Sequence, residues 1–115
     1  MKKIVTYVLT GLLALIFISS GVMKLVGPAP VVEGFTKFGL AAWRVPIGIL
    51  ELACVGLFLF PKTRIVGALL LCSYMGGAIV THLSHGEPII LPAVVLAVVW
   101  VVTYLRNPRF FVSEG

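Results

Sequence analysis

The fold of this chain follows from the stretch Phe17-Ile18-Ser19-Ser20-Gly21-Val22-Met23-Lys24-Leu25. Here the first long apolar segment ends in small and polar residues that are followed by a lysine. A helix that crosses a bilayer core of about 30 Å needs roughly 20 apolar residues. The segment from about residue 4 to residue 26 meets that requirement. It opens on Met1-Lys2-Lys3 like a secretory signal, but we expect a retained membrane helix.

The composition also indicates a membrane protein. Of 115 residues, 60% are hydrophobic and only 11% are charged, which lies far outside the composition of soluble globular domains. We expect one all-α domain over residues 1–115, an integral membrane four-helix bundle. Its spans should lie at about residues 4–26, 44–60, 65–81 and 89–105.

The predicted spans are joined by short connections. Gly27-Pro28-Ala29-Pro30 and Pro61-Lys62-Thr63-Arg64 end the first two spans, because proline cannot continue a helix. The segment from residue 31 to residue 43 is too short and too polar to span. Its apolar residues are spaced for a short helix that lies at the membrane interface, between the first and second spans.

Basic residues predict the orientation of the spans. Lysine and arginine outnumber aspartate and glutamate by 9 to 4, and in a membrane protein they indicate topology and contacts with lipid headgroups rather than nucleic acid. One side of the predicted bundle holds Lys2, Lys3, Lys62, Arg64, Arg106 and Arg109, and the other holds Lys24, Lys37 and Arg44. This bias predicts that both termini are cytoplasmic.

An acidic residue, Glu51, lies about seven positions, or roughly 10 Å, inside the second span. A charged side chain at that depth is costly unless it is paired or protonated. The helix directions bring polar groups of the first and third spans to the same half of the bilayer, and we predict an outward-facing polar pocket there. Its candidate residues are Ser20, Lys24, Glu51 and His82, with Ser19, Arg44 and Cys54 as secondary candidates.

The predicted Lys24–Glu51 ion pair has two interpretations. Buried pairs can serve only to fix the register of packed helices. Ionisable residues inside a membrane are also candidates for function, in which case the pair lines a pocket. His82 could join the pair as a hydrogen-bond partner or proton carrier. With His85 and Glu87 it lacks the remaining ligands of a closed zinc site, so we expect no metal there.

Two cysteines, Cys54 and Cys72, lie at similar distances from the turn between the second and third spans. A redox pair is one interpretation. The other is that both are small apolar residues, since buried thiols are usually unreactive. Cys72 also belongs to a series with Ala68 and Gly76, whose four-residue spacing predicts close contact with another helix.

The chain resembles the DoxX and DoxX-like family of small bacterial membrane proteins over nearly its whole length. The resemblance rests on the opening stretch, the Gly/Pro loop, the segment ending in Gly39-Leu40, Gly48-Ile49-Leu50-Glu51-Leu52 and the Pro61–Arg64 turn. It implies a four-helix protein of the bacterial inner membrane, with Gly21, Lys24 and Glu51 at characteristic positions. Some relatives are subunits of thiosulfate:quinone oxidoreductase or belong to redox complexes linked to thiol homeostasis, and more distant ones are membrane chaperones.

Two functions of different classes follow from the resemblance and the residues. The first is a membrane subunit that binds quinone or a similar lipophile in the Lys24/Glu51 pocket beside a redox protein. The second is a non-catalytic assembly or chaperone factor that acts through helix contacts, with a membrane protein or a second copy of the chain as partner. The chain carries no self-contained catalytic motif and no evident cofactor motif, so the sequence leaves open whether it is an enzyme.

Overall fold

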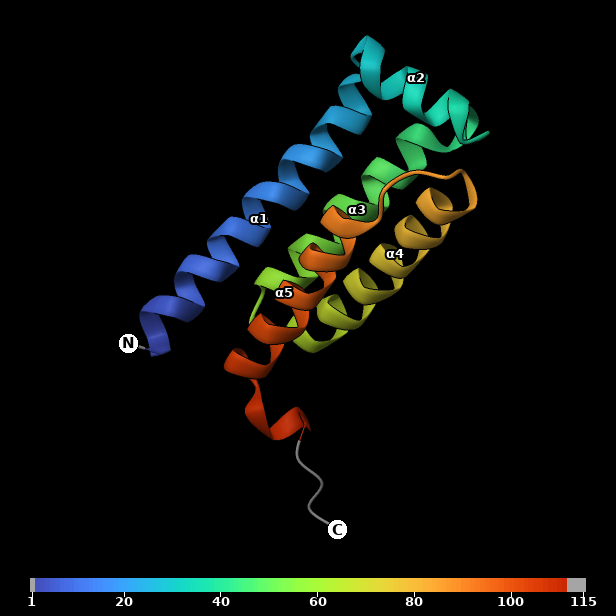
Figure 1. Cartoon of the computed structure of the whole chain (residues 1–115). Coiled ribbons are helices and arrows are strands. Elements are labelled where there is room, and N and C mark those ends of the chain that lie inside the picture. The colour runs from blue at the N-terminus through green and yellow to red at the C-terminus, as the bar shows by residue number, and fades with distance from the viewer. Residues whose placement is uncertain (1, 112–115) are drawn as a thin grey trace.

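The computed structural model describes residues 2–111, and these residues form helices and no strands (Figure 1). The four long helices are α1 (Lys2–Val26), α3 (Arg44–Leu59), α4 (Arg64–Ser84) and α5 (Ile90–Arg106). The all-α prediction is confirmed, and each predicted span corresponds to one long helix. The largest difference is in α4, which continues to Ser84, since residues 78–85 contain neither proline nor glycine and Gly86 follows the helix end.

Short elements join and follow the long helices. Helix α2 (Ala29–Lys37) and the 3-10 turn η1 (Ala41–Trp43) connect α1 to α3, and the turn η2 (Pro108–Phe111) follows α5. The chain enters α2 through Gly27, whose φ of 73° few residues other than glycine adopt. A short helix is therefore present between the first two spans, as predicted. It begins two residues before the predicted segment of residues 31–43 and ends at Lys37.

The helices suit a lipid environment. Residues 3–26, 41–59 and 64–84 are long and apolar enough to cross a membrane, and the 17-residue α5 is shorter but also apolar. Large apolar side chains such as Leu15, Val66 and Ile90 are exposed on the outward faces. In water such surfaces would be costly, whereas lipid covers them without penalty.

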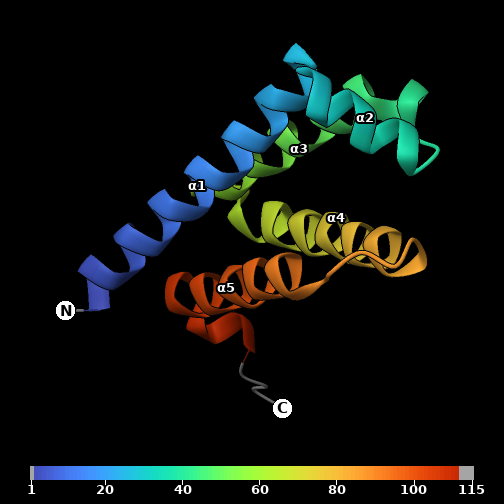
Figure 2. The same cartoon turned by 45° about the horizontal axis from the view of Figure 1, so that its top comes forward.

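The four long helices pack in a closed order. Helix α1 packs chiefly on α3, α3 on α4 and α4 on α5, and α5 returns to α1 (Figures 1 and 2). The centre is filled by apolar side chains that are almost fully buried, namely Leu13, Phe17, Phe58, Leu71 and Val99. This core lies in the half of the bundle that contains the start of α1 and the end of α5, and the polar residues described next lie nearer to α2.

Glycines allow the closest helix contacts. A Cβ atom at Gly67 of α4 would fall into the backbone of α3, 2.5 Å from the carbonyl carbon of Leu57. Ala68 beside it is buried, as the small-residue series predicts. Gly76 has no such contact within the chain, because no atom lies within 4 Å of a Cβ built there. Its contact with a helix of another protein stays a prediction. The close approach is confined to the start of α4, where the short turn holds the two helices together.

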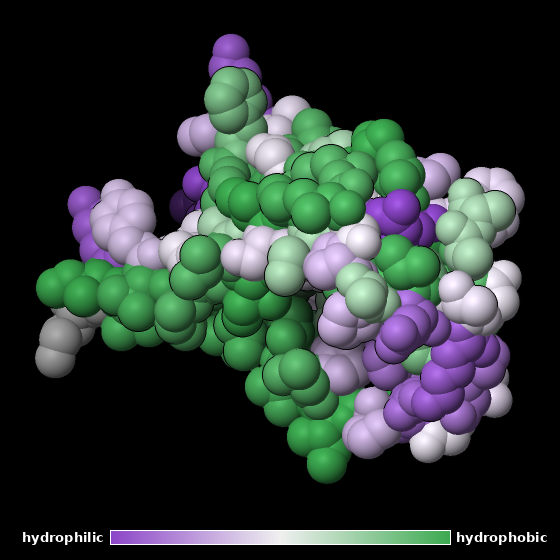
Figure 3. Space-filling view, turned by 90° about the horizontal axis from the view of Figure 1, so that it is seen from above, coloured by the Kyte–Doolittle hydropathy of each residue, from purple (hydrophilic) through white to green (hydrophobic). Residues whose placement is uncertain are grey.

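Helix α2 is tied to the loop that joins α4 to α5. Lys37 at its end forms an ion pair with Glu87 of that loop. The ring of Phe38 contacts the rings of His82 and His85, with centroids 5.2 and 5.0 Å apart. Viewed from above this end, the largest hydrophilic area gathers on one side, and most of the remaining surface is hydrophobic (Figure 3).

Candidate functional site

The carboxylate of Glu51 is the centre of a polar cluster inside the bundle. Its side chain is 2% exposed, and its Oε1 atom accepts three hydrogen bonds. The donors are Lys24 Nζ at 2.7 Å, Tyr74 OH at 2.9 Å and Ser20 Oγ at 3.2 Å. No described residue donates a hydrogen bond to Oε2. Three helices therefore converge on one oxygen of this carboxylate.

A pair of glycines brings the two charges together. Gly21 of α1 and Gly48 of α3 lie one helical turn before Lys24 and Glu51. A Cβ atom at Gly48 would lie 2.9 Å from Lys24 Cβ and 3.1 Å from the Gly21 carbonyl oxygen, and one at Gly21 would lie 2.7 Å from Leu52. Side chains at these two positions would push the helices apart. The glycines thus set the separation at which the ion pair forms.

The ion pair balances the charge of a carboxylate that could not remain alone in this interior. A carboxylate in an apolar interior is strongly destabilised unless an opposite charge and hydrogen bonds compensate it. Lys24 Nζ supplies the charge, and it also donates to Ser20 Oγ at 2.5 Å. The ammonium lies 6.0 Å from the centre of the Tyr74 ring. The side chain of Lys24 is 15% exposed, so it lies nearer to the surface than Glu51.

The cluster lines a cavity of about 260 Å³. Its polar wall contains Ser20, Lys24, Glu51, Tyr74 and His82, and its apolar wall contains Ile16, Phe17, Met75, Ala78, Leu91, Pro92 and Val95. Ile16 of α1 and Leu91 of α5 are 46% and 74% exposed. The cavity therefore reaches the outer surface between α1 and α5, where lipid would lie.

A second cavity of about 310 Å³ lies on the other side of α4. It is lined by Phe38 and Leu40, by Ile47 and Leu50 of α3, and by Ser73, Gly77 and Thr81 of α4. Tyr74, Ala78 and His82 line both cavities. The two cavities are thus separated by one face of α4, and Tyr74 is the wall residue that touches Glu51.

Comparison with known families identifies the chain. A family model described as the DoxX-like family matches residues 8–102, which include the whole polar cluster. The chain belongs to the DoxX-like family. It is accordingly an integral membrane protein with membrane-spanning helices. Comparison with curated proteins and with solved structures found no match.

In this DoxX-like protein the four main candidate residues lie at one cavity. Ser20, Lys24 and Glu51 are joined by hydrogen bonds, as the sequence suggested for the charged pair. His82 lines the cavity, but its Nδ1 atom lies 2.7 Å from the carbonyl oxygen of Ala78 and it forms no hydrogen bond with Glu51. His82 lies two residues before the end of α4, so it lines the part of the cavity nearest to that helix end.

The three secondary candidates lie outside the cavity lining. Ser19 is exposed on the surface of α1, and Cys54 is buried one turn beyond Glu51 in the apolar core. Arg44, the first residue of α3, donates a hydrogen bond from Nη1 to the carbonyl oxygen of Lys24. This contact satisfies a carbonyl group near the end of α1 and fixes the backbone that carries Lys24.

Tyr74 is a member of the site that the sequence analysis did not single out. A usable signal was present, since a tyrosine deep within an apolar span needs a partner for its hydroxyl group. Tyr74 lies about 15 Å from the end of α4 at Ser84, which is below the interfacial level where tyrosine is usual. The partner itself depended on the angle between α3 and α4, which periodicity does not provide.

The described residues include no group of three histidine, cysteine or acidic side chains placed to hold a metal ion. Cys54 and Cys72 are both free thiols. Cys54 belongs to the core, and Cys72 packs at its edge. The chemistry gathered at the site is therefore that of an ion pair and three hydroxyl or imidazole groups.

Proposed function

We propose that this DoxX-like protein binds a lipophilic small molecule with a quinone-like polar head in the Glu51 cavity. The observation that supports it most is a buried ion pair lining a cavity that reaches the lipid-facing surface. Binding sites for small molecules are commonly apolar cavities with a few convergent polar groups.

The hydrogen-bonding capacity left in the cluster fits such a head. An ammonium group has three N–H donors, and Ser20 and Glu51 use two of those of Lys24. One donor remains for a carbonyl oxygen of the ligand. Glu51 Oε2 remains as an acceptor for a hydroxyl group. A quinone presents carbonyl oxygens and a quinol presents hydroxyl groups, so the cluster can pair with both forms.

The size and opening of the cavity favour a ligand with a tail. A volume of about 260 Å³ lies below the range of roughly 300–1,000 Å³ that encloses whole drug-sized molecules. It would hold a ring and leave an apolar tail outside. Between Ile16 and Leu91 such a tail would pass directly into lipid.

We also propose a location for the binding site. We assign both termini to the cytoplasm and the chain to a bacterial inner membrane, which puts the Glu51 cavity in the outer half of the bilayer. The residues at the site can bind and exchange protons but carry no redox group. The protein would accordingly act as a membrane subunit beside a redox partner.

A second candidate is a non-catalytic assembly factor that recognises partner helices. Gly76 and Gly77 of α4 support it, because a Cβ atom at either position would meet nothing within 4 Å. Small residues on an outward face allow another helix to approach closely in lipid. Gly77 also lines the second cavity, so a partner helix that packs on Gly77 and a ligand at Glu51 would occupy different sides of α4.

Ligand binding can be tested with the purified full-length protein in neutral detergent, using a short-tailed ubiquinone as the probe. We expect Glu51→Gln to weaken binding by about tenfold or more, since it removes the carboxylate offered to the ligand head. Ser20→Ala should weaken binding less, since it removes a hydroxyl group that orients Lys24 and Glu51. Ser73→Ala, a matched loss of a hydroxyl group in the second cavity, should bind like the wild type. Unchanged affinity in a folded Glu51→Gln variant would refute the proposal, and capture of a partner protein without ligand binding would favour the second candidate.

A further inference from the structure

We infer that the end of the bundle opposite α2 holds the phosphate group of an anionic phospholipid. A cavity of about 500 Å³ lies there between the start of α1, the turn from α3 to α4 and the end of α5. Its lining includes Lys3, Arg64 and Arg106, one cation from each of these three segments. It lies at the other end of the bundle from α2 and is separate from the Glu51 cavity.

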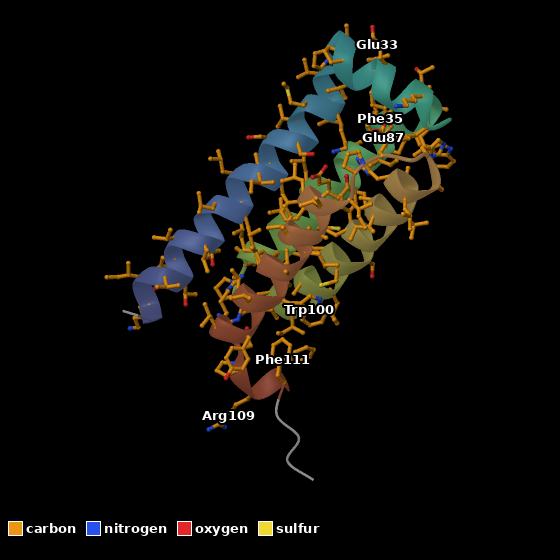
Figure 4. The ribbon with its side chains drawn as sticks, viewed as in Figure 1. Glu33, Phe35, Glu87, Trp100, Arg109 and Phe111 are labelled. Atoms are coloured by element: carbon orange, nitrogen blue, oxygen red, sulfur yellow. The ribbon has the colours of Figure 1, made fainter. Side chains whose placement is uncertain are left out.

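No described carboxylate offsets these three charges. Among the acidic residues that the structure describes, Glu33 and Glu87 lie at the α2 end, far from Arg109 at the opposite end (Figure 4). Glu51 is engaged with Lys24 in the interior. Within residues 2–111 the cavity therefore presents a positive charge, which an anionic ligand would balance.

The cavity is bordered by the N-terminal ends of α1 and α4 and by the C-terminal ends of α3 and α5. Arg64 is the first residue of α4, and Lys3 lies in the first turn of α1. The opposite partial charges of these helix ends roughly cancel, so the side-chain cations set its positive charge.

The third cation is held in a fixed position. Arg106 Nη1 donates to the carbonyl oxygen of Phe58 at 2.6 Å and Nη2 donates to that of Leu59 at 3.3 Å. Its guanidinium also lies 4.9 Å from the centre of the Phe58 ring. A guanidinium has five N–H donors, so others remain for a ligand. The contacts with α3 orient the group in advance, which lowers the entropy lost on binding.

The apolar part of the lining favours a lipid as the source of the phosphate. Leu59 and Leu105 line the cavity together with Tyr7, which is 73% exposed. These residues lie at the ends of membrane helices, at the depth where headgroups meet acyl chains. Basic pockets between membrane helices are suited to anionic lipid headgroups. A lipid headgroup and free phosphate would both present a phosphate anion to the cations. Only a phospholipid would also place its glycerol and upper acyl chain against the apolar residues.

The test compares two double variants of the full-length protein in neutral detergent, with lipid binding followed by native mass spectrometry. Lys3→Gln/Arg64→Gln removes two charges from the cavity. Lys62→Gln/Arg109→Gln removes the same charge from exposed residues at the same end that do not line it. Phosphatidylglycerol, phosphatidylcholine and inorganic phosphate are the probes. We expect phosphatidylglycerol to bind the cavity variant roughly 25-fold more weakly, about fivefold per cation, and the control variant almost normally.

Three results would overturn the inference. Equal weakening in both double variants would mean that the basic end attracts lipid without a site. Equal binding of phosphatidylcholine and phosphatidylglycerol would mean that the cations do not select charge. Displacement of phosphatidylglycerol by an equal concentration of inorganic phosphate would identify free phosphate as the ligand. Should the double variant fail to fold, Arg64→Gln compared with Lys62→Gln carries the same test, with an expected loss of about fivefold, and Arg64→Lys should retain binding.

Discussion

Removal of Lys24 should destabilise the protein more than removal of the charge on Glu51. In Lys24→Met, the carboxylate keeps its hydrogen bonds from Tyr74 and Ser20 but loses the one opposite charge that a described residue places within 4 Å. In Glu51→Gln, an amide oxygen can still accept from Tyr74 and Ser20. The ammonium of Lys24 then lacks a counterion. The two variants thus leave different charges behind.

The burial of the charge that remains in each variant decides how much the free energy of unfolding falls. Glu51 is 2% exposed, so it cannot reach water when Lys24 is replaced. Loss of one partner of a buried pair costs about 3–5 kcal/mol. The side chain of Lys24 is 15% exposed and flexible, so its ammonium can move toward the interface when Glu51 is neutral. We expect Glu51→Gln to cost about 1–2 kcal/mol, close to the loss of a hydrogen bond to a charged group.

Reversible unfolding by sodium dodecyl sulfate in mixed micelles, followed by tryptophan fluorescence, would measure both free energies. Lys37→Met is the control, because Lys37 pairs with Glu87 while its side chain is 61% exposed, and it should change the free energy of unfolding little. The reasoning is refuted if Glu51→Gln costs as much as Lys24→Met. A double Lys24→Met/Glu51→Gln variant should recover part of the loss, since it leaves no buried charge.

Three further predictions concern single contacts. Tyr74→Phe removes one hydrogen bond to Glu51 and should lower the free energy of unfolding by about 0.5–2 kcal/mol in the same assay. Gly67→Ala should cost about 1–3 kcal/mol because its Cβ would meet the backbone of α3, whereas Gly76→Ala has open space and should leave stability unchanged or improved; equal effects would contradict the packing. Hydrogen bonding and attraction by Lys37 hold the pKa of Glu87 below its ordinary value of 4.5. The lowered pKa stabilises the folded state above pH 4.5, and this contribution is lost as the pH falls through the lower pKa. Because the pair is exposed, the melting temperature of the wild type should exceed that of Glu87→Gln only slightly at about pH 7 and not at all at about pH 3.

The sequence predicted the helices well because lipid imposes a simple rule on them. Every backbone group inside a bilayer must be paired within its own helix, so apolar length and proline positions nearly determine the spans. The same rule made Glu51 conspicuous, since an acid at that depth requires a partner. Lys24 could be chosen as that partner from its depth and charge alone.

The spacing of apolar residues along the sequence does not give the angles between packed helices. Tyr74 was missed because its contact with Glu51 depends on how α4 is rotated against α3, where Gly67 packs against the backbone of Phe58. For the same reason the sequence could not show that Gly76 has open space within the chain. Small residues permit a close approach, but the neighbouring side chains decide where along the helix it occurs.

The order in which the partners of Glu51 occur along the chain affects how the protein can be inserted into a membrane. Lys24 precedes Glu51 by 27 residues and Tyr74 follows it by 23. During synthesis from the N-terminus, α1 reaches the bilayer before α3. The acid therefore enters lipid when its counterion is already present, and the hydroxyl group of Tyr74 joins them only when α4 arrives.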